Sequence, residues 1–452
     1  MSWRSRLAVV VLAGAGIAEL LLARREATVF FIGQHWHLEA LIGIWAAVGL
    51  IAAAAAHHAP RRVGLAGIVV LAVGLRLVAA SGAPPSISSD VYRYMWDAHV
   101  QLSGIDPYSA APNSPSLQHL HPVALWPTPD GCARDHRGPG CSRLNRPQDR
   151  TIYPAVAEIW FVAVHLVNPD DYGTRPWQLA AGFVDDLTVV LLAFALARQG
   201  RDPRAVAWYA LCPLPVVEFA NNGHVDGVAL LLMVAAVLAL RRDRRVLAGV
   251  LIGLATMVKL YPALGVVAGW RQGRWRLAVA AVATMVLTEA PHVVAVGVRV
   301  LGYLPGYLRE ERYTSGGRFL LLGLAHLPGR VAVALAVALI AATAVEVVRR
   351  RVEAATALTV LLGAVVFVAT PVQPWYAVAV GGVAVLADFP LLLAAAAAAE
   401  PYYAAVELNS RHQIAIGRLS YGLAGLVVGA ALLRRRRRGI LARGEPVRQA
   451  VG

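Results

Sequence analysis

Long apolar segments separated by short polar turns recur from one end of the chain to the other. A helix needs ~20 mostly apolar residues to cross a bilayer. The segments that approach this pattern are 7–23, 41–56, 63–80, 152–167, 177–197, 205–220, 227–240, 246–270, 277–290, 319–348, 355–370, 377–387, 391–399 and 415–433. We predict an all-α, polytopic membrane protein, with residues 1–452 forming one membrane domain of roughly eleven to thirteen transmembrane helices.

Proline interrupts several of these segments, at Pro213, Pro262 and Pro328. A proline frees backbone groups that must be satisfied by protein or by water inside a membrane. We therefore expect breaks at these positions. We interpret segment 319–348 as a half-helix followed by a span.

One polar stretch, residues 88–108, differs from everything around it. Read as a helix, it places polar residues at i, i+3, i+4, i+7 and i+11, and these are Asp90, Arg93, Tyr94, Asp97 and Gln101. The opposite face is apolar and consists of Val91, Met95, Ala98 and Leu102. The helix is predicted to begin at a Ser88 or Ser89 cap and to end before Gly104 and Pro107.

An amphipathic helix between spans usually lies in the membrane interface. Its polar face would present Asp90, Asp97 and Arg93 to whatever lies above the membrane. A second interpretation makes Asp90 a helix cap and Arg93–Asp97 a solvated ion pair. The stretch alone does not decide between them.

Arginine clusters at the ends of apolar segments indicate the orientation, because basic turns face the cytoplasm. The turns assigned inside are 57–62, 198–204, 241–245, 349–351 and 434–438, and 434–452 is a basic cytoplasmic tail. Loops 81–150 and 291–318 then face outward. Segment 152–167 must not cross the membrane if this assignment holds, so we predict that it is re-entrant or interfacial.

Composition supports a membrane protein and excludes nucleic acid as the partner. Hydrophobic residues make up 58% of the chain, and much of the +15 formal charge comes from the arginine turns. Eight residues separate Cys132 from Cys141 in the large loop. We predict that these two cysteines form a disulfide. Free thiols, or a metal site completed by His136, are the alternatives.

Several motifs in this chain resemble the actinobacterial polyprenyl-phosphate-mannose-dependent α-mannosyltransferases of the cell envelope, within the GT-C superfamily. The most specific are Asp90-Val-Tyr-Arg-Tyr-Met-Trp-Asp97, Gly104-Ile-Asp-Pro-Tyr108, Asn145-Arg-Pro147 and Thr151-Ile-Tyr-Pro154. Later ones are Gly223-His-Val-Asp226, Lys259-Leu-Tyr-Pro262 and Pro371-Val-Gln-Pro-Trp-Tyr376. Ala155 stands where the family pattern has a second proline, and the cysteine-bracketed insertion is not part of that pattern.

The resemblance implies a GT-C-like bundle whose first large outer loop carries interfacial helices and a catalytic carboxylate at Asp90. It also implies a sugar donor linked to polyprenyl phosphate. The chemistry agrees, because sugar transfer needs a base for the acceptor hydroxyl and cations for the departing phosphate. Asp90 and Asp97 are the catalytic candidates. Candidates for binding substrate or phosphate are Arg93, Tyr94, Asn145, Tyr153, His224, Asp226, Lys259, Arg318, Gln373, Trp375 and Tyr376.

Two aromatic residues of the first outer loop, Trp96 and Tyr108, are further candidates for stacking on a sugar or lining the lipid entry, as are Trp375 and Tyr376. For each residue taken alone, an interfacial aromatic belt is the favoured explanation. His224 and Asp226 are interpreted as structural or substrate-orienting residues rather than metal ligands, so neither a metal nor a cofactor is predicted.

The sequence therefore predicts a multi-pass glycosyltransferase of the cell membrane, with its active site facing outside. It would move a sugar, mannose by the resemblance, from polyprenyl phosphate to a glycolipid or lipid-linked glycan. The alternative is a membrane transporter or lipid flippase using Glu19, Asp185 and Asp186 as a relay. A protein acceptor is a further possibility with the same donor.

Overall fold

The computed structural model describes residues 2–29, 31–82, 85, 87–134, 137–167, 172–316 and 318–437, and their regular structure is entirely helical. The predicted fold class is confirmed. The longer helices are α1 (Trp3–Glu26), α2 (Phe31–His58), α3 (Arg61–Ala80), α7 (Arg175–Arg198), α10 (Asp226–Arg241), α13 (Trp270–Val296), α15 (Gly329–Arg349) and α19 (Gln413–Arg437). The shorter ones are α4 (Asp90–Leu102), α5 (Pro129–Arg134), α6 (Ala155–His165), α8 (Ala207–Ala210), α9 (Pro213–Pro215), α11 (Arg245–Thr256), α12 (Leu264–Ala268), α14 (Leu304–Glu310), α16 (Ala354–Val368), α17 (Pro374–Leu386) and α18 (Ala394–Glu407).

Fewer helices are long enough to span a membrane than the sequence predicted. Among the described residues, seven helices pass by length and composition, and a bent pair would make eight. The predicted eleven to thirteen is too high because four apolar segments form helices of only 10–17 residues. These are α6, α11, α16 and α17, and all fall short of the ~20 residues a simple span needs.

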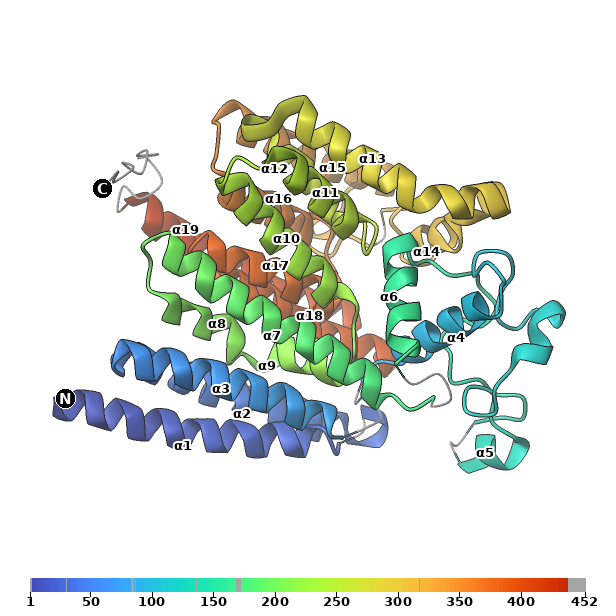
Figure 1. Ribbon diagram of the computed structural model, residues 1–452, viewed down its shortest axis with the longest axis horizontal. Coiled ribbons are helices and arrows are strands. Elements are labelled where there is room, and N and C mark those ends of the chain that lie inside the picture. Colours follow the sequence, from blue (N-terminus) through green and yellow to red (C-terminus); the bar gives the residue numbers. More distant parts are fainter. Residues whose placement is uncertain are drawn as a thin grey trace.

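The two ends of the bundle differ in what they carry (Figure 1). The N-terminus of α1 and the C-terminal end of α19 lie at one end, whereas α4, α6 and α14 lie at the other. α6 stays at the same end as α4, as expected for a segment that does not cross. Residues 168–171, which follow it, and residues 438–452 of the predicted basic tail lie outside the described residues.

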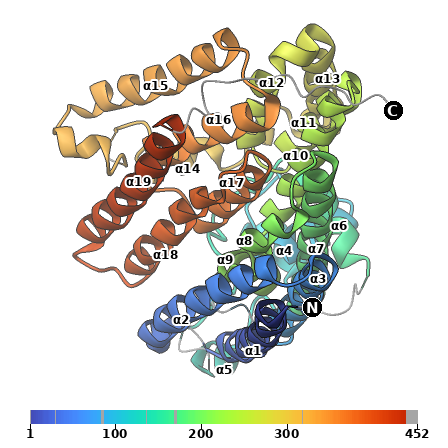
Figure 2. The same cartoon turned by 90° about the vertical axis from the view of Figure 1, so that its left-hand side faces the viewer.

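Viewed along the bundle, α10 and α17 occupy the middle, and α15 and α1 lie toward the outside (Figure 2). α17 is buried along most of its length, which explains how so short a helix contributes to the main hydrophobic core. α13 and α15 bury few residues against the rest of the chain. Their apolar surfaces are therefore left to face lipid.

The segment predicted as a span over 205–220 is instead a series of short turns. A 3-10 helix (Pro203–Val206), α8, α9 and a π-helix (Val216–Asn221) follow one another, and the last makes a 118° bend with α10. Pro213 and Pro215 remove backbone donors, which prevents a continuous helix. The predicted breaks at Pro262 and Pro328 are also present, since α11 ends before the first and α15 begins after the second.

The second loop begins later than predicted, because α13 continues through Pro291 to Val296. A 3-10 turn (Gly297–Leu301) and α14 complete the loop. Gly302 has φ +51° and lies against Thr151, where a Cβ would come within 1.8 Å of the carbonyl oxygen. Only glycine fits there, so this contact joins the second loop to the first.

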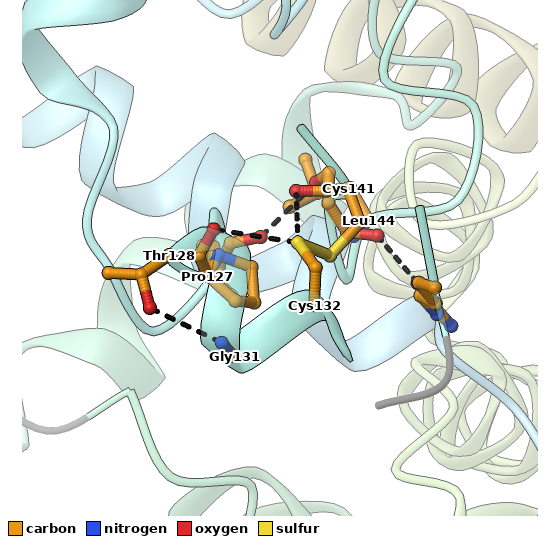
Figure 3. The surroundings of a disulfide bond; sticks show 9 residues. Pro127, Thr128, Gly131, Cys132, Cys141 and Leu144 are labelled. Carbon is orange, nitrogen blue, oxygen red and sulfur yellow. Dashed lines mark hydrogen bonds between the residues drawn. A yellow bond between two sulfur atoms is a disulfide. The ribbon is translucent and has the colours of Figure 1, made fainter. Parts of the chain in front are cut away.

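The first loop contains the predicted helix and the predicted disulfide. α4 runs from Asp90 to Leu102, and Gly104 at φ +79° ends it. Cys132, in α5, is bonded to Cys141 (Figure 3), while His136 between them lies outside the described residues. The disulfide closes a small subloop at the edge of the molecule, away from the bundle.

Candidate active site

A cavity of about 480 Å³ lies where the two loops meet the bundle. Its wall combines the start of α4, residues 145–154 and 259–261, α14, α16, α17 and the end of α18. Of the predicted site residues, it brings together Asp90, Arg93, Asn145, Tyr153, Lys259, Gln373, Trp375 and Tyr376. Motifs that are far apart in the sequence thus converge on one space.

Asp90 is held from both sides at the first position of α4. Asn145 Nδ2 donates to Asp90 Oδ1 at 2.5 Å, and the Tyr153 hydroxyl donates to Oδ2 at 3.1 Å. Burial and the nearby Asp90 raise the pKa of Tyr153 well above its ordinary value, so its hydroxyl keeps its proton and remains a donor. The side chain of Asp90 is 15% exposed, which leaves it accessible from the cavity.

His224 acts on Asp90 through Ser88. The Ser88 hydroxyl accepts from the Asp90 amide at 3.2 Å and lies 2.9 Å from His224 Nε2. His224 Nδ1 lies 2.8 Å from Glu218 Oε2, and its ring packs on Trp375 with 4.0 Å between centroids. Ser89 occupies the N-cap position of α4 without a capping side-chain bond, and the neighbouring Ser88 hydroxyl accepts from the first helical amide instead. His224 is buried and does not line the cavity.

Lys259, the only lysine of the chain, reaches the cavity at the break after α11. Its Nζ lies 3.7 Å from Asp226 Oδ2 and 3.4 Å from the Tyr376 hydroxyl. It also lies over the rings of Tyr153 and Tyr376, at 4.8 and 5.0 Å from their centroids. Lys259 therefore places its ammonium group against the ring of Tyr153, the side chain that also holds Asp90.

The start of α6 fixes this arrangement. The carbonyl of Met257, two residues before Lys259, accepts from the amides of Val156 (3.0 Å) and Ala157 (3.1 Å). Tyr153 and Lys259 are thereby attached to each other through the backbone. Asp226 is fully buried and receives the Tyr261 hydroxyl at 3.4 Å, so it supports Lys259 from behind.

Arg93 and Asp97 are buried, so the second interpretation, in which they form a solvated ion pair, is wrong. Both Asp97 oxygens accept from Arg93 Nε, at 2.9 and 3.0 Å, with side chains only 5% and 1% exposed. Arg93 Nη1 donates to the carbonyl of Asp149 at 2.9 Å. α6 covers this face of α4, since the two helices pack together. Arg93 lines the cavity, but Asp97 does not and reaches it only through Arg93.

Other candidates lie outside the cavity wall. Tyr94 is in the core, stacked on Phe161 at 4.3 Å, and Trp96 packs edge-on against Trp126 at 4.6 Å. The Tyr108 hydroxyl donates to the Tyr153 carbonyl. Arg318 pairs with Glu311 and lies over the Tyr313 ring at 4.6 Å. Trp96 and Tyr108 are therefore packing residues rather than a sugar platform or an interfacial belt.

The relay expected for a transporter is also absent from the cavity. Asp185 is bonded to Arg76 and to the Tyr209 hydroxyl inside the bundle, and Asp186 lies 3.5 Å from the same arginine. Glu19 is fully buried on α1. None of these three acids lines the cavity.

Several cavity residues were missed from sequence. Arg146, Asp149 and Arg150 adjoin the Asn145-Arg-Pro and Thr151-Ile-Tyr-Pro motifs, and that proximity was an available signal. The others come from α14, α18 and the loop between α14 and α15, and no local pattern indicated them. They are Tyr303, Tyr307, Tyr313, Tyr403 and Glu407.

Part of the cavity lining is apolar. It consists of Leu362, Val365 and Val366 of α16, the adjoining Ala369, Val380 of α17, and Leu260, Leu304 and Leu308. The described residues contain no cluster of three or more His, Cys, Asp or Glu side chains placed to hold a metal ion.

A comparison with protein families finds a match. The model of glycosyltransferase family 87 matches residues 152–371, a little under half of the chain. The match contains Tyr153, His224 and Lys259, whereas Asp90 precedes it. No curated protein and no solved structure matches the chain. The match indicates glycosyltransferase activity and supports a GT-C-type enzyme in this polytopic, all-helical membrane protein.

Proposed function

We propose that this protein transfers a sugar, mannose in the first instance, from polyprenyl phosphate to a glycolipid or lipid-linked glycan. The observation that carries the proposal is the composition of the cavity. Its lining combines carboxylates, among them Asp90, with cationic side chains, among them Arg93 and Lys259, and with aliphatic residues around about 480 Å³. A carboxylate suits an acceptor hydroxyl, cations suit a phosphate, and the aliphatic wall suits an isoprenoid chain.

In this mechanism Asp90 is the general base. The acceptor hydroxyl attacks the anomeric carbon of the donor, and its proton passes to Asp90. The bond between the anomeric carbon and the phosphate oxygen breaks, and polyprenyl phosphate departs with the electron pair. Asn145 and Tyr153 hold the carboxylate in one orientation by donating to its two oxygens. Attack opposite the departing phosphate inverts the anomeric centre.

Lys259 and Arg93 would stabilise the departing phosphate. Lys259 supplies a compact charge beside Tyr153, and Arg93 supplies a planar group with several donors. The chain's own Asp226 and Asp97 hold these cations in place. Trp375, Tyr376 and Tyr303 provide flat faces for sugar rings at the same cavity.

The cavity is proposed to face outside the cytoplasmic membrane. The arginine-bearing start of α1 and the arginine-rich end of α19 lie at the opposite end of the bundle from the cavity. By the charge rule, this supports the orientation. An enzyme with its site there takes a donor that has already crossed the membrane. Cysteine-accessibility labelling of the 81–150 loop in intact cells checks the orientation, and labelling only after permeabilisation would contradict it.

The activity is tested with purified protein in liposomes that contain extracted membrane glycolipids. Polyprenyl phosphates carrying labelled mannose, glucose or arabinose are supplied separately. We expect label from the mannose donor to enter the glycolipid fraction, and no transfer by Asp90→Asn protein. Transfer of a different sugar would revise the donor alone. Movement of intact lipid between leaflets without transfer would favour the flippase alternative.

A further inference from the structure

Two carboxyl groups are buried side by side beneath the cavity, one on α4 and one on α6, which pack together (Figure 1). Asp97 is 1% exposed and Glu158 is fully buried. Glu158 Oε1 receives the Thr151 hydroxyl at 2.7 Å, and Oε2 receives Gln101 Nε2 at 2.8 Å. Thr151 also faces Asp97, so one hydroxyl lies between the two acids.

The charges in this cluster do not balance if both acids are ionised. Within the described part of the chain, Arg93 is the one cation bonded to either of them, through its two contacts with Asp97. Two buried carboxylates against one guanidinium would leave an unpaired negative charge out of water, which is costly. One of the two must therefore carry a proton.

The proton belongs on Glu158. Burial raises the pKa of both carboxyls, but the adjoining Arg93 lowers that of Asp97 again. Burial and then the Asp97 charge raise the pKa of Glu158 well above its ordinary value. The first amides of α6 do not offset this, because Met257 and Pro154 carbonyls already accept from them. The Thr151 hydroxyl, which donates to Glu158 Oε1, also interacts with Asp97 and so joins the two acids.

We propose that Glu158 is a positioning residue that holds a proton at neutral pH and, through Thr151 and Asp97, keeps the Arg93 guanidinium directed at the cavity. A neutral Glu158 leaves Arg93 with a single counterion, so its remaining donors stay available to an anionic group. Arg93 Nη2 is buried and has no hydrogen-bond partner among the residues that the structure describes, as a donor reserved for such a group would be. The role in transfer rests on the proposed function, whereas the protonation does not.

Other titratable groups surround Glu158. They are Arg93 and Asp97 on α4, Asp106 and Tyr108 in the following loop, and Glu289 and His292 on α13. Asp106 is already paired with His292, whose Nδ1 lies 2.7 Å from its carboxylate. The negative charge that requires a proton is thus confined to Asp97 on α4 and Glu158 on α6.

Infrared spectroscopy of the full-length protein tests the protonation. A difference spectrum of wild type minus Glu158→Gln should contain the carbonyl band of a buried carboxylic acid at pH 7. The matched control is Glu346→Gln, because Glu346 is exposed and paired with Arg349 and Arg350. Its difference spectrum should show only an ionised carboxylate. A carboxylate band for Glu158 at pH 7 would overturn the proposal, whether or not the protein transfers sugar.

Binding and turnover test the positioning role. Glutamine copies a protonated glutamate, so Glu158→Gln should keep undecaprenyl-phosphate binding and transfer near wild type. Glu158→Ala removes the partner of Thr151 and Gln101 and should weaken both by about tenfold. Wild-type activity should fall at high pH as Glu158 loses its proton, and Glu158→Gln should lack this fall. Equal loss in the glutamine and alanine variants, or an unchanged high-pH limb in Glu158→Gln, would overturn it.

Discussion

Two arginine–aspartate pairs are buried among the described residues, and they differ in how completely each arginine is used. Arg76 in the bundle donates to Asp185 through Nε and Nη2 and to the carbonyls of Ala72 and Ala210 through Nη1. Arg93 beside the cavity donates to Asp97 and to one carbonyl, and its Nη2 has no partner in the part of the chain that the structure describes. The closed pair joins helices, and the open pair keeps a donor for a ligand.

The largest effect should come from breaking the closed pair. Asp185→Ala leaves Arg76 and the Tyr209 hydroxyl without their partner inside the bundle. We expect the free energy of unfolding to fall by about 3–5 kcal/mol, because an unpaired buried charge is strongly destabilising. Thermal unfolding in detergent measures it.

Replacing both members, Arg76→Met with Asp185→Leu, should recover most of that stability. Recovery of folding together with transfer would show that the closed pair is structural. A stable double variant without transfer would instead assign it a part in catalysis.

Asp90→Asn should produce the next largest effect, on turnover rather than on stability. The amide keeps the shape of the side chain but has one oxygen, not two, to accept from Asn145 and Tyr153, and it cannot take a proton. We expect transfer to fall by roughly 100-fold or more, with donor binding near normal. Initial rates and donor binding, measured on the same preparation, separate the two.

Asp97→Asn serves as the comparison, since its carboxylate reaches the cavity only through Arg93. It should cost less turnover than Asp90→Asn. Near-full activity in Asp90→Asn would place the base elsewhere, at Asp97 or Asp226. Loss of expression in Asp90→Asn, with loss of turnover alone in Asp97→Asn, would make Asp90 only a helix cap.

The disulfide should affect the first loop alone. Cys132→Ala with Cys141→Ala opens a subloop with eight residues between the cysteines. The chain-entropy model gives a loss of about 2–3 kcal/mol for so short a loop. We expect faster proteolysis within 120–150 and unchanged turnover. Reaction of both thiols with maleimide in non-reduced protein would contradict the bond itself.

The smallest effect should come from Lys259→Gln, which removes one phosphate-binding charge while Arg93 remains. We expect about tenfold weaker binding of undecaprenyl phosphate, since a charged hydrogen bond contributes about 1.5–3 kcal/mol and the site keeps its second cation. Arg318→Gln is the control, because Arg318 pairs with Glu311 outside the cavity wall. Equal weakening by both substitutions would argue against the assigned phosphate site.

Local signals in the sequence were sufficient for the features that depend on neighbouring residues. The start of α4 at Asp90, the break at Lys259 and the bond between Cys132 and Cys141 all follow from caps, prolines and spacing. The number of spans did not follow from local signals. The apolar pattern shows that a segment is hydrophobic, but not how neighbouring helices surround a short helix such as α17.

The site was predictable only where one side chain suffices to define a role. The sequence does not show that Glu311 pairs with Arg318, or that α6 covers Asp97. Glu407 reaches the cavity from more than three hundred residues after Asp90. Such pairings are set by tertiary contacts, which a pattern along the chain does not contain.

The two amides that donate to the Met257 carbonyl limit where the cavity can be enlarged by mutation. Because they attach Tyr153 and Lys259 to one backbone junction, these side chains move as one body, and that side of the cavity cannot widen without breaking the junction. A larger or smaller substrate must be accommodated elsewhere in the lining. Val366 of α16 and the adjoining Ala369 line the cavity and take no part in the junction. Changes of selectivity for chain length should therefore begin at these two positions and leave the junction intact.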